Sequence, residues 1–381
     1  HCAAYTEEGM DAIAPRPTAP FPATATPEDD ARDPEAEPEA SPDDGVRVEP
    51  RPVYIVLCVD NENLRPHDRN RVLAQTRRFV SEIMRPHVQV MVVSAQRSTE
   101  IVQPLTSDPR EVDAALRSLT RTYGARVDHD RQRSRVIHDL QETEIDTGGS
   151  RPQQARELED RIRVYGEELS MELDYAVNSL RDVLTTLAGL QGRKVVVHVS
   201  NGLPAVPARD LIDWYGDLFQ QNSTLPMLTR FNRRRLFDAL ASSANALGVS
   251  FYTIDATGLG GNAAGSAEYS RPIDPIYANV YAVNHQEPLF FLAERTGGRT
   301  VVDANDVTGL LEQLRDDLFV YYSLGYTLPT TGADTVHRIQ VELPGHPEYT
   351  LVFRRTLIEK SLESQVQDTV VCSLGVPVAQ G

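Results

Sequence analysis

The sequence predicts an α/β protein with a doubly wound, mostly parallel, Rossmann-like sheet, helices on both faces, and a small antiparallel β extension. Apolar runs without polar alternation, such as residues 53–59, are typical of strands that are covered on both faces. Strand and helix patterns alternate five times up to residue 318, which is the order expected of βαβ units. Beyond residue 319 apolar and polar residues alternate between turn sequences, which indicates antiparallel strands.

The first half of the predicted domain contains three strands and a long helical segment. We expect strands at 53–59, 87–95 and 101–105, the last at a sheet edge, and a helix at 68–84 that Pro86 ends. Asp108 and Pro109 predict a second helix, because a capping acid precedes a proline at the first helical position. Residues 123–152 are polar and weakly patterned, and 153–190 has a helical period. We interpret 123–190 as an insertion that is helical in its second part.

The second half repeats this alternation. We expect strands at 194–200, 249–255 and 300–302, and helices at 208–220, 228–247, 286–296 and 306–318. His198 falls inside a strand, so we interpret it as a packed core histidine. The strands of the extension are expected at 320–327, 336–343 and 349–355.

Composition divides the chain into four parts. Residues 1–50 hold nine prolines and 13 Asp and Glu against three Arg, a net charge of −10, and are predicted to be a disordered acidic Pro/Ala-rich leader. Residues 51–318 form the α/β domain, 319–356 the β extension and 357–381 a tail that stops abruptly. The start at His1 and this abrupt end indicate either a removed targeting signal or a fragment.

Several classes of protein are not expected. The total charge of −17 leaves −7 after residue 50, with no strongly basic domain, so we expect no nucleic-acid partner. No apolar run reaches the roughly 18 residues of a transmembrane helix. The three cysteines are odd in number and far apart, which predicts neither a disulfide framework nor a zinc site. We find no nucleophile turn of the Gly-x-Ser-x-Gly kind and expect no enzyme activity.

Two polar segments follow predicted core strands. The first is Asp60-Asn61-Glu62-Asn63 and the second is Ser200-Asn201-Gly202. Open α/β sheets bind ligands at the carboxyl ends of their strands, so we predict that a protein partner binds at Asp60, Asn61, Asn63, Asn201 and Gly202. A simpler interpretation stays open, in which Asp60, Asn61 and Asn63 only form the turn beyond a buried strand.

The order of these elements resembles the von Willebrand factor A-type domain, and in particular bacterial, acidobacterial-type proteins related to it. The matching pieces are Val59-Asp60-Asn61, residues 192–202, 251–255 and 292–298, with 321–326 similar to the β extension of those proteins. The match covers residues 53–356. The resemblance implies a non-enzymatic, adhesion-type protein-binding module in an extracytoplasmic location, either periplasmic or secreted.

The resemblance also implies a degenerate metal-ion-dependent site. The family motif Asp-x-Ser-x-Ser gives oxygen ligands to Mg²⁺ or Mn²⁺. Asp60 matches it, whereas Glu62 and Leu64 stand at the serine positions, and Asn201 replaces the acid of a later Thr-Asp-Gly turn. The candidate metal ligands are therefore Asp60, Glu62, Asn63 and Asn201. No other cofactor is implied.

Two alternatives to a binding module stay open. The run Gly258–Gly265 follows a strand as a dinucleotide phosphate loop does, which suggests a Rossmann-type nucleotide-binding enzyme. Against this, Pro272 and Pro275 follow closely and no apolar helical pattern starts there. The second alternative is a structural scaffold without a ligand.

Overall fold

The computed structural model of the chain describes most of residues 51–324 and parts of both ends. The described residues are 2–5, 51–121, 126–145, 151–219, 224–259, 272–319, 321–324, 335–345, 356–359 and the single positions 351, 353, 361, 363 and 366. Most of the predicted leader and tail, and residues 260–265 of the glycine-rich run, lie outside them. None of the described helices is long and apolar enough to cross a membrane.

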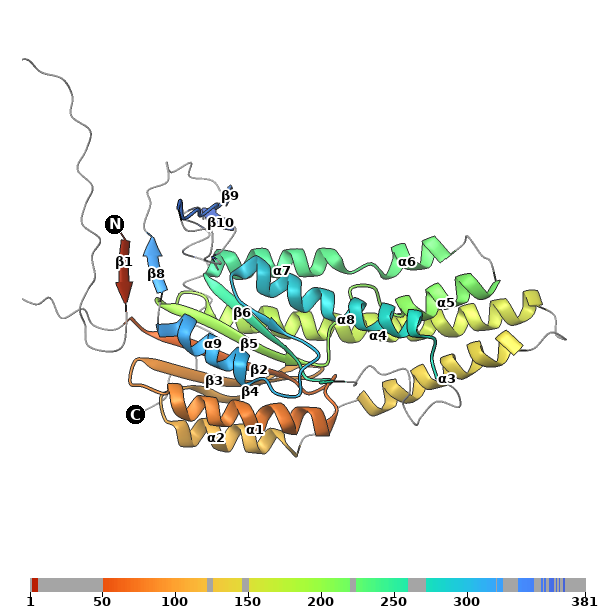
Figure 1. Ribbon diagram of the computed structural model, residues 1–381, viewed down its shortest axis with the longest axis horizontal. Helices are drawn as coiled ribbons and strands as arrows, with labels where there is room; N and C mark the ends of the chain where they lie inside the picture. Colours follow the sequence, from red (N-terminus) through yellow and green to blue (C-terminus); the bar gives the residue numbers. More distant parts are fainter. Residues whose placement is uncertain are drawn as a thin grey trace, which may run out of the picture.

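The centre of the fold is a mixed, mostly parallel sheet with the strand order β4-β3-β2-β5-β6-β7 (Figure 1). Its parallel strands are β2 (Val53–Asp60), β3 (Val88–Ala95), β5 (Arg193–Ser200), β6 (Val249–Asp255) and β7 (Thr300–Val301). The edge strand β4 (Thr99–Thr106) runs antiparallel to β3 with shifts of register. The predicted doubly wound sheet and its edge strand are confirmed.

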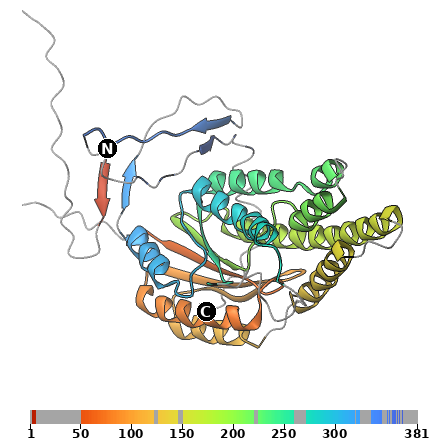
Figure 2. The same cartoon turned by 45° about the vertical axis from the view of Figure 1, so that its right-hand side comes forward.

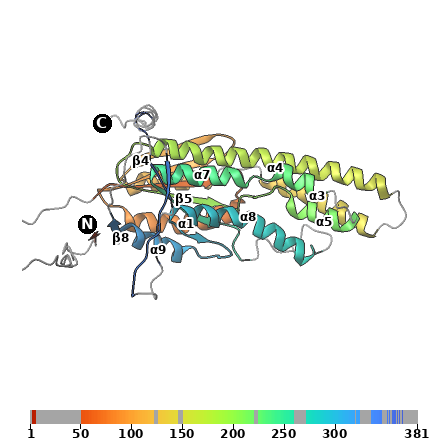
Figure 3. The same ribbon diagram turned by 90° about the horizontal axis from the view of Figure 1, so that it is seen from above.

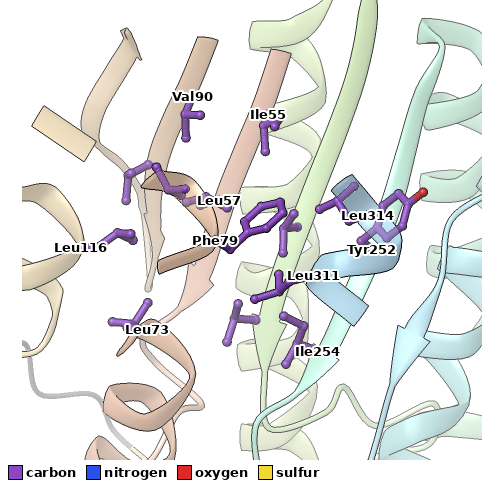
Figure 4. Packing of buried hydrophobic residues seen from close by; sticks show 14 of the residues in the cluster. Ile55, Leu57, Leu73, Phe79, Val90, Leu116, Tyr252, Ile254, Leu311 and Leu314 are labelled. Atoms are coloured by element: carbon purple, nitrogen blue, oxygen red, sulfur yellow. The ribbon is translucent and has the colours of Figure 1, made fainter. Parts of the chain in front are cut away.

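Helices cover both faces of this sheet. On one face, α1 (Pro66–Ile83), α2 (Pro109–Leu119) and α9 (Thr308–Phe319) pack against Ile55, Leu57 and their neighbours (Figure 4). On the other, α4 (Arg151–Leu187), α7 (Arg234–Leu247) and α8 (Pro275–Thr296) pack against Val56 and Cys58. Side chains alternate between faces along each strand, so both faces of β2 are buried, which explains its unbroken apolar sequence.

A helical extension projects beyond the ends of the strands (Figure 3). It consists of α3 (Arg126–Ile145), the first half of α4, α5 (Arg209–Phe219), α6 (Leu225–Phe231) and the start of α8, around a third apolar core that includes Ile137, Ile162 and Trp214. The weakly patterned residues 123–152 thus contain a 20-residue helix that sequence analysis missed. Its inner face carries the buried Arg126 and Arg133 beside apolar residues, which removes the apolar period.

Two predicted helices have different bounds in the structure. The helix expected at 228–247 is two helices, α6 and α7, because the chain turns at Asn232 and Arg233. The helix expected at 286–296 begins at Pro275, where Asp274 accepts a hydrogen bond from the Ile276 N–H at 2.8 Å. The prediction that no helix starts near Pro275 was wrong. The first turns of α8 pack on the helical extension rather than on the sheet.

The segments at the two ends pair outside the main sheet (Figure 2). The strand β8 (Tyr321–Leu324) runs antiparallel to β1 (Cys2–Tyr5), and β9 (Thr335–Arg338) runs antiparallel to β10 (Thr356–Glu359). The predicted antiparallel extension is confirmed, although β10 begins after the strand expected at 349–355. Residues 2–5, at the start of the predicted disordered leader, form a strand.

His198 is a core histidine, as predicted, and gives the fold a dependence on pH. It lies 1% exposed in β5, neither ring nitrogen has a hydrogen-bond partner among the described residues, and burial lowers its pKa from 6.5 to about 4. The folded state therefore holds a neutral ring, whereas the unfolded chain binds a proton below about pH 6.5. The stability that this neutral ring provides is complete above that pH and is lost towards pH 4.

We predict that His198→Leu flattens the acid side of the stability profile. From about pH 7 to about pH 4, His198 should account for a fall of about 3 kcal/mol in the free energy of unfolding. Urea denaturation of both proteins at several pH values measures this, and the comparison of slopes cancels the change in packing. Equal slopes in the parent and the variant would contradict the prediction.

Candidate functional site

The candidate site lies where the sheet changes its direction of winding. The chain leaves β2 towards β3 on one side and later returns to β5 on the other side, so β2 and β5 are neighbours whose crossovers diverge. Ligands of open α/β sheets bind in the crevice at such a switch point. Asp60 ends β2 and Ser200 ends β5, and the Ser200 hydroxyl donates to Asp60 Oδ2 at 2.9 Å. The two predicted polar segments thus meet.

Asp60 is buried and its carboxylate is fully engaged. Asn63 donates its backbone N–H to Oδ1 at 3.3 Å, and its side-chain NH₂ group lies 3.2 Å from Oδ1 and 3.0 Å from Oδ2. Burial raises the pKa of Asp60, while the hydrogen bonds from Asn63 and Ser200 and the charge of Arg126 act in the opposite direction. The carboxylate therefore organises the loop that follows β2.

Asn61 holds this loop to the neighbouring strand. It is fully buried, its amide donates to Ser94 Oγ at 2.7 Å, and Arg69 Nη1 lies 3.5 Å from its oxygen. This arrangement links β2 to the end of β3, so Asn61 positions its neighbours from within the core.

Glu62 connects the loop to the helical extension. Its carbonyl oxygen accepts the backbone N–H of Arg126 at 3.1 Å, and its carboxylate lies 3.8 Å from Arg97. Burial and the nearby Glu172 raise the pKa of Glu62, while Arg97 lowers it. Glu172 of α4 lies 2.7 Å from His129 of α3, which ties these two helices together above the loop.

The loop after β5 contains a buried amide without partners. Asn201 is 3% exposed, and among the described residues neither its Oδ1 nor its Nδ2 has a hydrogen-bond partner. Such groups are rare in native proteins, because each costs about 1–3 kcal/mol. A polar group from outside the chain would satisfy this amide.

Gly202 brings the loop against α8. It has a φ of +93°, and a Cβ atom at this position would lie 2.7 Å from Cβ of His285. His285 donates its Nδ1–H to the Tyr281 carbonyl at 2.8 Å and its own carbonyl accepts from Leu203 N at 3.0 Å. Burial, together with Arg126, lowers the pKa of His285 to about 3, so the ring is neutral.

A small cavity of about 20 Å³ lies between the two loops and the helical extension. It has room for about one water molecule. Its lining brings together residues from the loop after β2, from α3, α4 and α8, and from the loop after β5: Asn63, Arg126, Leu169, Glu172, Leu173, Gly202, Leu203, Pro204 and His285. The sequence predicted only Asn63 and Gly202 of this set.

A buried polar network behind the cavity was also missed. Arg126 Nη2 donates to the Tyr281 hydroxyl at 2.7 Å, and Arg126 Nε lies 3.0 Å from Asp130. Arg133 lies 4.1 Å above the Tyr281 ring and pairs with the buried Asp210. The one sequence signal was the seven-residue spacing of Arg126 and Arg133, which places both on one face of a helix.

Of the four candidate metal ligands, the structure brings Asp60 and Asn63 into direct contact. Within the described ranges no three His, Cys, Asp or Glu side chains are grouped so that they could hold an ion. Hard cations need a shell of oxygen ligands. Here the NH₂ group of Asn63, and not its oxygen, lies against the carboxylate of Asp60.

The glycine-rich run is held as a structural turn at its start. Gly258 has a φ of +71°, and a Cβ there would lie 2.3 Å from Arg71 Nη1. The next described helix, α8, has the Asp274 carboxylate at its N-terminus. A pyrophosphate needs free N–H groups at that position, so this helix start is unsuited to a nucleotide.

The comparisons with known proteins found solved structures alone. No model of a protein family and no curated protein matches the chain. The vWF domain of the type V pili tip protein Mfa5 from Porphyromonas gingivalis is 13% identical over 70% of this chain and 95% of that chain, with a TM-score of 0.36. A structure of three N-terminal domains of the same protein is 12% identical over 71% of this chain and 50% of that chain, with a TM-score of 0.37. The chain therefore spans half of that structure.

A further similar structure is proximal thread matrix protein 1 from the mussel byssus, described with a zinc-occupied MIDAS motif. It is 10% identical over 72% of this chain and 47% of that chain, with a TM-score of 0.35. A vWF domain is thus among the solved structures that are similar to this chain. Because these TM-scores are low, the evidence for the doubly wound fold is the strand order of the chain itself.

We predict that Gly202→Ala destabilises the fold, because it combines a positive φ with a clash against His285. The expected loss is about 1–3 kcal/mol in the free energy of unfolding. Gly309→Ala is the matched control, since a Cβ in α9 meets nothing within 4 Å and should raise stability by up to about 1 kcal/mol. Urea denaturation compares them, and equal effects would contradict the close packing of Gly202.

Proposed function

We propose that the chain is a non-enzymatic protein-binding module of the von Willebrand A-related class that engages its partner at the carboxyl ends of β2 and β5. The observation that carries this proposal is the buried amide of Asn201 at the switch point of the sheet, which has no hydrogen-bond partner in the described part of the chain. A buried polar group without partners costs stability, and a partner that supplies hydrogen bonds would recover this cost on binding.

The geometry around Asn201 favours recognition of a partner surface over catalysis. A cavity of about 20 Å³ is far smaller than the roughly 300 Å³ or more of small-molecule sites. Asp60 already accepts from Asn63 and Ser200, and His285 is neutral and bonded to Tyr281. Asp60 and His285 are thus occupied in holding the loops.

In this proposal the predicted residues have different roles. Asn63, Asn201 and Gly202 form the part of the loops that the partner meets, while Asp60 and Asn61 hold those loops on the sheet. The resemblance of the sequence to the family is the ground for the extracytoplasmic location that we infer.

A ligand-free scaffold is the second candidate. The hydrogen bonds of Asp60 with Asn63, and of Asn61 with Ser94, favour it, because they complete a turn without any ligand. A binding module needs the Asn201 amide to contact its partner, whereas a ligand-free scaffold tolerates a substitution at this position.

We predict that Asn201→Ala does not lower stability. Removal of an unpaired buried amide should leave the free energy of unfolding unchanged or raise it by up to about 1 kcal/mol. Thermal and urea denaturation of the parent and the variant measure this. A loss above about 1 kcal/mol would mean that the amide is bonded within the folded protein and has a structural role.

We also predict that the same substitution weakens partner binding. The immobilised protein is incubated with envelope proteins of the source organism, and retained proteins are quantified for the parent, Asn201→Ala and the control Asn178→Ala, which alters an exposed amide on α4. A partner should be retained equally by the parent and the control and at least about tenfold less by Asn201→Ala, as expected for the loss of about 1.4 kcal/mol. Equal retention by all three would favour the scaffold.

A further inference from the structure

We propose that the guanidinium of Arg126 is the built-in cation of the switch point and stands where a metal-ion-dependent site would hold a divalent ion. The ligand face would then work without metal. This inference rests on the proposed function, because it concerns the face at which we propose that the partner binds. Its test measures stability and needs no partner.

The first argument is the position of Arg126. It is the first residue of α3, and its backbone N–H donates to the Glu62 carbonyl at 3.1 Å, two residues after Asp60. Arg126 is 9% exposed, and its side chain lines the small cavity together with Asn63 and Gly202. The positive charge therefore lies between the loop after β2 and the loop after β5.

The second argument is that this charge is held in place. Arg126 Nη2 donates to the Tyr281 hydroxyl of α8 at 2.7 Å, and Nε lies 3.0 Å from Asp130. Asp130 also accepts from Arg65 Nε at 2.8 Å, at the start of α1. A guanidinium does not lose its proton in proteins, so the fold carries a permanent buried cation at this point.

The third argument is the pairing of the nearby carboxylates. A buried carboxylate is costly unless a cation compensates it. Glu62 has the cation Arg97 at 3.8 Å. Asp60 accepts from neutral donors, Asn63 and Ser200, and forms no ion pair among the described residues; the charge of Arg126, the weakest influence on its pKa, lowers it.

A divalent ion beside Asp60 would face the fixed charge of Arg126 and the NH₂ group of Asn63, and both repel it. Metal binding would require the start of α3 to leave the loop after β2. In the folded chain the helical extension therefore supplies the charge that an oxygen-ligated ion would otherwise provide.

A double-mutant cycle on the full chain tests the proposal. Asp60→Asn should lower the melting temperature of the parent by several degrees, since it removes an acceptor of buried hydrogen bonds. In the Arg126→Met background the same substitution should instead raise the melting temperature, because it removes a carboxylate left without its cation. This reversal of sign is the expected result.

Arg133→Met is the matched control, because Arg133 is also buried in α3 and contacts Tyr281, but pairs with Asp210. Asp60→Asn should lower the melting temperature in this background, as in the parent. A rise in the control as large as that with Arg126→Met, or no rise with Arg126→Met, would overturn the proposal. If Arg126→Met does not fold, Arg126→Lys keeps the charge and should show no rescue by Asp60→Asn.

Metal titration gives a second readout that needs no variant of Arg126. The melting temperature of the parent should not change when MgCl₂ or MnCl₂ is added. A rise that Asp60→Asn abolishes would show an ion at Asp60 in the presence of Arg126, and the proposal would be wrong.

Discussion

The hydrogen bond between Ser200 and Asp60 is the contact on which the candidate site depends, because it joins the ends of two parallel strands across the switch point. Its existence follows from the register of β2 with β5, which pairs Val53 with Arg193 and Val59 with Val199. A slip of one residue would turn every side chain of one strand to the opposite face. The two apolar cores of the sheet fix this register, and so the packing of the domain determines which polar groups meet.

The strands, and with them the polar segments of the site, could be predicted from sequence, whereas the groups that surround those segments could not. An apolar run such as that of β2 indicates a buried strand from local sequence alone. The residue after the run must then lie at the carboxyl end of that strand. Arg126 and Glu172 reach the same cavity from helices far along the chain. Such contacts depend on tertiary packing and leave no period in the sequence. The polar inner face of α3 also hid that helix.

The start of α8 was missed although its signal was present. Asp274 and Pro275 repeat the pair formed by Asp108 and Pro109, and in both cases the carboxylate accepts from the N–H two residues later, at 2.8 Å. The first pair was correctly predicted as a helix start from its capping acid and proline, whereas the second pair was not used in this way. After Pro275 the apolar residues contact the helical extension first and the sheet later, so no single face has a continuous period.

The charged groups and the neutral amide at the switch point have different roles. Asp60 and Arg126 are charged and buried, whereas Asn201, which has no hydrogen-bond partner among the described residues, is neutral. A surface that keeps its charges internal gains little from long-range attraction, since a neutral amide acts only at hydrogen-bonding distance. Recognition at this face would therefore depend on shape and on hydrogen-bond geometry, and the helical extension, which lies directly beside the cavity, would decide which partner surfaces can approach Asn201.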